Sequence, residues 1–89
     1  MKNKVLVNLL IPEIDAQFDI YLPLNKQIGN VIELLNKVLP DITKGIYIPS
    51  EDKHLYNRDT GAIYNVNTIL KNTDIRNATT LILLRQRGN

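Results

Sequence analysis

The stretch IGNVIELLNKVL, residues 28–39, spaces its apolar side chains as an amphipathic α-helix does. At about 100° per residue, six of them fall on a single stripe: Ile28, Val31, Ile32, Leu35, Val38 and Leu39. Burying them would stabilise the fold by roughly 1.5–3 kcal/mol each, as an upper estimate. This helix must therefore cover a sheet. We expect it to be capped by Asn25 or Gln27, with Asn25 preferred for its short side chain, and to end at Pro40.

Two strands are predicted before this helix. Residues 4–11 are apolar and rich in branched side chains, which is typical of a strand. Residues 17–22 alternate polar and apolar side chains, which indicates a half-buried strand, and the short break between the two favours an antiparallel hairpin. The basic start and apolar run also resemble a signal peptide, but Asn8 interrupts the run and no small-residue cleavage pattern follows.

Shorter elements are predicted after the helix. Residues 46–48 suit a short strand or an extended connection, and residues 54–57 and 62–64 suit the two arms of a hairpin. Residues 68–70 suit one helical turn, and the nearly continuous apolar run at residues 79–84 suits a central strand. The fold class expected from this order is α+β, with a mixed four- to five-stranded sheet packed on one amphipathic helix.

Composition sets bounds on the class of protein. The 89 residues suit one domain, residues 1–89, and a hydrophobic fraction of 44% is enough for a packed core. A net charge of +2 gives no electrostatic reason to expect nucleic acid as a partner. No stretch approaches the roughly 20 apolar residues of a membrane span, so direct membrane insertion is not expected. The lack of cysteine favours a reducing, cytoplasmic setting.

No residue pattern indicates catalysis, a cofactor site or a metal site. His54 is the one histidine, and neither a cysteine nor a suitably spaced carboxylate accompanies it. The acidic pairs Glu13/Asp15 and Glu51/Asp52 fall in expected loops. There, solvent does not give the two carboxylates of a pair the different environments that acid–base catalysis needs. The four glycines are too far apart for a phosphate-binding loop. We therefore expect a protein that is not an enzyme.

The predicted order of elements resembles that of ubiquitin, whose fold is the β-grasp. Residues 70–75 (LKNTDI) and 79–88 (TTLILLRQRG) are similar to its short helical segment and to its last strand with the basic tail. Among ubiquitin-like proteins the chain most resembles the bacterial YukD/EsaB group, on length, composition and the segment LYNRDTG at residues 55–61. That group accompanies the type VII (ESX-like) secretion systems of Gram-positive bacteria. The resemblance implies a soluble accessory or regulatory protein whose partner is a secretion-system membrane component.

The end of the sequence departs from ubiquitin. Ubiquitin and the bacterial sulfur carriers act through a C-terminal Gly-Gly, a tail without side chains that threads into an activating enzyme. Gly88-Asn89 stands in that place here, so a C-terminally activated carrier is the weaker prediction. Arg85 and Arg87 form a small basic cluster that is suited to contact with an acidic partner.

Strand alternation predicts leftover apolar surface on the sheet face away from the helix. If the first and last strands pair as in ubiquitin, that face gathers Leu10, Tyr56, Ile82 and Leu84. A contiguous apolar patch on a small protein usually marks an interface, and tyrosine is a favoured anchor there. We therefore expect a protein-interaction module that is a monomer or a weak homodimer. The alternatives are a structural homo-oligomerising domain with an exposed strand edge and a small accessory subunit of an oxygenase complex.

Overall fold

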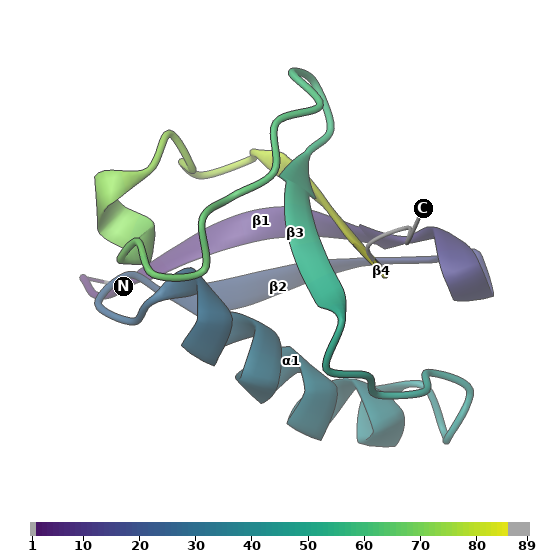
Figure 1. Cartoon of the computed structure of the whole chain (residues 1–89). Coiled ribbons are helices and arrows are strands. Elements are labelled where there is room, and N and C mark those ends of the chain that lie inside the picture. Colours follow the sequence, from purple (N-terminus) through teal and green to yellow (C-terminus); the bar gives the residue numbers. More distant parts are fainter. Residues whose placement is uncertain (1, 86–89) are drawn as a thin grey trace.

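The computed structural model describes residues 2–85 of the chain, which form a sheet with one long helix across it (Figure 1). The sheet contains β1 (Lys4–Ile11), β2 (Ala16–Pro23), β3 (Lys53–Asn57) and β4 (Thr80–Arg85). The helix is α1 (Ile28–Ile42), and two short 3₁₀ helices are η1 (Pro12–Ile14) and η2 (Leu70–Asn72). No helix among these residues is long and apolar enough to cross a membrane.

The sheet is mixed, with the strand order β2-β1-β4-β3. β1 pairs antiparallel with β2 along its whole length, and β3 pairs antiparallel with β4. The two terminal strands, β1 and β4, are parallel neighbours in the centre of the sheet. The predicted hairpin, the pairing of the first and last strands, and the α+β class are thereby confirmed.

The core lies between one face of the sheet and α1. Alternate residues of β1 point into it, and so do alternate residues of β4, as period-2 patterning requires. Five side chains of the predicted stripe on α1 are buried there, and only Val38 remains half-buried. The core side chains from these three elements are Val5, Val7, Leu9, Ile11, Ile28, Val31, Ile32, Leu35, Leu39, Leu81 and Leu83.

Gln27 is the residue before α1, but no side chain caps the start of the helix, so the predicted cap by Asn25 or Gln27 is wrong. A loop far along the chain supplies the acceptors instead. The N–H of Ile28 donates to the carbonyl of Thr68, and the N–H of Gly29 donates to the carbonyl of Val66, both at 2.9 Å. A Cβ on residue 29 would lie 3.2 Å from that Val66 oxygen, which explains the glycine at this position.

The far end of α1 also differs from the prediction, because the helix continues past Pro40 to Ile42. Pro40 occupies the last turn, and its carbonyl accepts the N–H of Gly45 at 2.8 Å. The N–H of Lys44 donates to the carbonyl of Asp41 at 3.3 Å, and Lys44 has a φ of 56°. This is the Schellman arrangement, which closes the helix two residues later than the proline alone suggested.

The segments predicted as short strands are mostly irregular. Residues 46–48 form no strand: Tyr47 is buried, while Ile46 and Ile48 are 64% and 69% exposed. Residues 62–64 make a single bridge, between Ile63 and Tyr56, rather than a full strand. The helical turn expected at residues 68–70 lies slightly later, at η2.

Candidate protein-interaction site

The four residues predicted to form an apolar patch occupy neighbouring positions on the helix-free face of the sheet. Ile82 of β4 stands between Leu10 of β1 and Tyr56 of β3 in the strand registers. Leu84 follows two residues later on the same face of β4, across from His54. All four patch residues are half-buried, and α1 covers the other face. We refer to Leu10, Tyr56, Ile82 and Leu84 as the sheet-face patch.

A polar band separates this patch from a second apolar pair on the same face. The amide of Asn8 donates to the carboxylate of Asp19 at 3.1 Å, directly beside Leu10 in the strand. Beyond that bond, Leu6 pairs across the strands with Tyr21, which is 50% exposed and borders a groove of about 590 Å³. The alternation of residues 17–22 already placed Tyr21 opposite the buried face, but Tyr21 was not singled out from the sequence.

A hydrogen-bonded turn anchors the strand end that carries Tyr56. The side-chain oxygen of Asn57 accepts the N–H groups of Asp59 and Thr60, at 2.8 and 3.1 Å. Its amide nitrogen donates to the hydroxyl of Tyr64 at 3.0 Å, and that hydroxyl donates to Asp74 at 2.6 Å. Burial and the bond to Asp74 raise the pKa of Tyr64 to about 12.

A buried lysine lies at the other end of β3. Lys53 is 4% exposed, pairs with the carboxylate of Glu13, and has its Nζ 4.5 Å from the centroid of the Tyr47 ring. Burial and the charge of Glu13 raise the pKa of Tyr47 to about 12. Its hydroxyl donates to the side-chain oxygen of Asn36 at 2.5 Å. Glu13, in η1, is thus an ion-pair partner and not a free loop carboxylate as predicted; nothing in its local sequence pointed to Lys53, 40 residues away.

The predicted basic contact residues divide between the described and undescribed parts of the chain. Nε of Arg85 donates to both carboxylate oxygens of Asp52, at 3.2 and 3.1 Å. A hydrogen bond from Ser50, together with Arg85, lowers the pKa of Asp52. Arg87 and the Gly88-Asn89 end lie outside residues 2–85, the part that the structure describes. Within that part, no three metal-ligating side chains gather.

Comparison with known proteins gives matches only among solved structures. No family model and no curated protein matches the chain. A subunit of an ESX-5 inner membrane complex superimposes with a TM-score of 0.80 and 19% identity, over 98% of this chain and 22% of that one. The EccD5 ubiquitin-like domain from Mycobacterium xenopi has a TM-score of 0.77 and 20% identity, over 97% and 98% of the two chains.

A third similar structure comes from a different kind of assembly. A chain of a toluene 4-monooxygenase complex has a TM-score of 0.73 and 11% identity, over 93% of this chain and 99% of that one. This chain thus spans only about a fifth of the ESX-5 subunit's length but nearly the whole of the other two chains. At identities this low the likeness concerns the fold, and the fold of this chain is the ubiquitin-like β-grasp.

Proposed function

We propose that this chain is a non-catalytic, ubiquitin-like module that binds a protein partner through the sheet-face patch. The observation that carries the proposal is the register that brings four half-buried apolar side chains together on the face opposite α1. Apolar groups gathered on a small domain usually mark an interface. A tyrosine in such a group supplies a large, rigid anchor. The turn held by Asn57 fixes the end of β3 that carries Tyr56.

We further propose that the module, one domain spanning residues 1–89, is a cytoplasmic accessory or regulatory component of a type VII secretion system. Its partner would be a membrane component of that system. The similarity to the ESX-5 subunit and the EccD5 domain supports this proposal, together with the LYNRDTG segment that resembles the YukD/EsaB group. The oxygenase-subunit alternative is supported by the toluene 4-monooxygenase chain. The adjacent genes discriminate between the two proposals. A membrane ATPase and small helical secreted proteins would support the secretion system, and oxygenase subunits would support the alternative.

The patch is tested with Tyr56→Ala and Leu84→Asp. Binding to the purified cytoplasmic part of the neighbouring membrane protein would be measured by interferometry, and folding by circular dichroism. Both variants should fold and bind at least about tenfold more weakly, because a central anchor is commonly worth about 2 kcal/mol. Tyr21→Ala, which removes a more exposed tyrosine from the same face, is the matched control and should bind like the wild type. Wild-type affinity in both patch variants would remove the patch as the interface.

A homo-oligomerising domain remains the second candidate, and a free sheet edge favours it. The N–H of Leu24 donates to the carbonyl of Asn3 at 2.9 Å. Because ladder bonds alternate in an antiparallel pair, Gln17, Asp19 and Tyr21 direct their backbone groups away from β1 at the outer edge of the sheet. Light scattering decides between the two candidates. The mass of a stable dimer would favour a homo-oligomerising domain that pairs through this strand edge, and the mass of a monomer would favour the protein-interaction module.

A further inference from the structure

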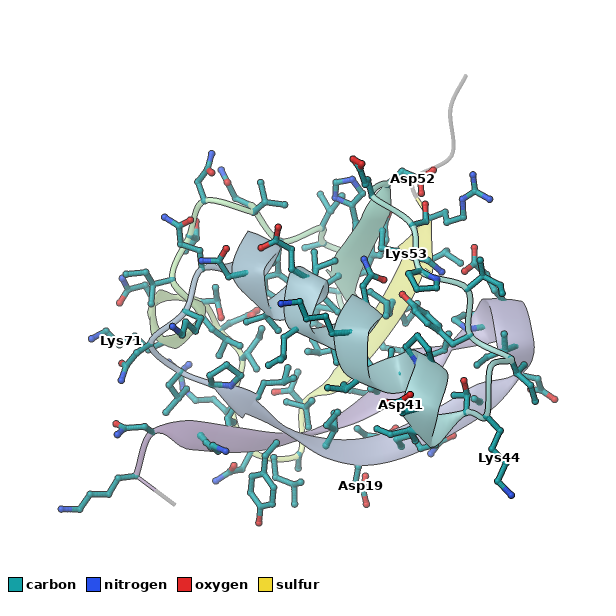
Figure 2. All side chains as sticks on the ribbon, turned by 90° about the horizontal axis from the view of Figure 1, so that it is seen from below. Asp19, Asp41, Lys44, Asp52, Lys53 and Lys71 are labelled. Carbon is teal, nitrogen blue, oxygen red and sulfur yellow. The ribbon has the colours of Figure 1, made fainter. Side chains whose placement is uncertain are left out.

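A groove at one end of the molecule is bordered by three cationic side chains, those of Lys4, Lys71 and Arg76. It lies between the start of β1, the short helix η2 and the loop that leads into β4, and it has a volume of about 300 Å³. Its floor is apolar and is made by Val5, Leu24 and Ile75. We call this site the basic groove. In Figure 1, η2 (light green) lies beside the chain's N-terminal end, and Figure 2 shows Lys71 far from Asp41 and Asp52.

No carboxylate within residues 2–85 forms an ion pair with any of the three cations. The two ion pairs in this part of the chain include none of them: Lys53–Glu13 and Arg85–Asp52. Arg76 is nevertheless held in place, because its Nη1 donates to the carbonyls of Thr73 and Ile75, both at 2.8 Å. Those carbonyls orient the guanidinium without cancelling its charge. Asp74, the acid nearest in sequence, accepts the hydroxyl of Tyr64.

The backbone beside the groove also has open hydrogen-bonding groups. The bond from Leu24 N–H to Asn3 shows that odd-numbered residues of β1 bond to β2, so even-numbered ones face the β4 side. On that side the N–H of Leu6 donates to the side chain of Asn77 at 2.9 Å. β4 itself pairs with only three residues, further along β1, and does not reach Lys4. The N–H and C=O of Lys4 therefore point to the side of the groove, just before the point where the N–H of Ala78 donates to the carbonyl of Leu6.

We propose that the basic groove binds an extended acidic peptide segment of a partner protein. Carboxylates of the peptide would meet the three cations, and one apolar side chain would rest on the floor. The peptide backbone would bond to Lys4 as a short added strand. An anionic membrane surface fits less well, because lipid recognition of this kind uses clusters of about four to eight basic residues, and this groove has three. The site is separate from the sheet-face patch and adds a second surface to the proposed function.

The test uses a fluorescein-labelled peptide of alternating glutamate and valine, with fluorescence anisotropy as the readout. The wild-type chain should bind it saturably, and raising NaCl from about 0.05 M to about 0.5 M should weaken binding because the contacts are ionic. The double variant Lys4→Glu/Lys71→Glu should lose at least about tenfold in affinity. The matched control, Lys37→Glu/Lys44→Glu, makes the same charge change on two exposed side chains, one on α1 and one in the turn that follows it, and should stay within about twofold.

Several results would overturn the proposal. Equal losses in the two double variants would mean that the peptide responds only to the net charge of the protein. No binding by the wild-type chain would refute the groove as a site for an acidic peptide. Tighter binding to phosphatidylserine vesicles than to the peptide would favour a membrane surface instead. Amide shifts in a ¹⁵N spectrum should map to Lys4, Ile75 and Asn77. Tyr56→Ala should bind the peptide like the wild type, which keeps this test independent of the sheet-face patch.

Discussion

Ionisation of Tyr64 should destabilise the fold at alkaline pH. Its side chain is 9% exposed, and its hydroxyl donates to Asp74 while accepting a hydrogen bond from Asn57. Burial, with the bond to Asp74, raises the pKa from the ordinary value of about 10 to about 12. The folded state therefore favours the neutral phenol. Its contribution is complete below about pH 10 and is lost as the pH rises through about 12.

The size of the effect follows from the two pKa values. A group that titrates at about 10 unfolded and about 12 folded lowers the free energy of unfolding by about 1.4 kcal/mol at about pH 11 and about 2.3 kcal/mol at about pH 12. Solvent around the exposed Asp74 carboxylate screens the interaction, so about 1 kcal/mol is the expected net loss. Tyr64→Phe abolishes this titration but also removes the bond to Asp74, which costs about 1–2 kcal/mol at about pH 8.

The assay is urea denaturation followed by circular dichroism, on the wild type and Tyr64→Phe, between about pH 8 and about pH 12. The advantage of the wild type should shrink as the pH rises and approach zero near the top of this range. Tyr47 and the lysines are present in both proteins, so their titration cancels in the difference. Tyr21→Phe, at a half-exposed tyrosine, is the control and should follow the wild type throughout. A stability difference between wild type and Tyr64→Phe that is constant with pH would refute the reasoning.

Two further predictions concern stability. Lys44→Gly should raise the free energy of unfolding by about 0.5–1 kcal/mol, because the left-handed position of the Schellman motif suits glycine; an unchanged or lower urea midpoint would contradict this. Glu13→Ala should cost about 3 kcal/mol, since it leaves the buried Lys53 charge without its partner. Adding Lys53→Met should restore most of that loss, and a double variant as unstable as Glu13→Ala alone would show that the ion pair is not the cause.

The amphipathic helix and the inward faces of the strands were predictable because periodicity is a property of the local chain. The stripe on residues 28–39 and the alternation in residues 17–22 indicate which side chains leave water, whatever they pack against. The same alternation placed Tyr56 and Ile82 on one face. Their adjacency to Leu10 depended on the parallel pairing of β1 with β4, which was expected from the resemblance to ubiquitin rather than from the residues.

The remaining features depend on contacts between segments far apart in the chain. Lys53 is buried because Glu13, 40 residues earlier, supplies its counter-charge. The start of α1 has no cap of its own because the carbonyls of Val66 and Thr68 reach it. The basic groove exists only where β1, η2 and the loop before β4 converge. By itself the sequence determined the helix, the strands that build the sheet and their buried faces, but not the irregular segments at residues 46–48 and 62–64. Only the tertiary structure decided which charges pair and which stay open, since pairing depends on distance in space.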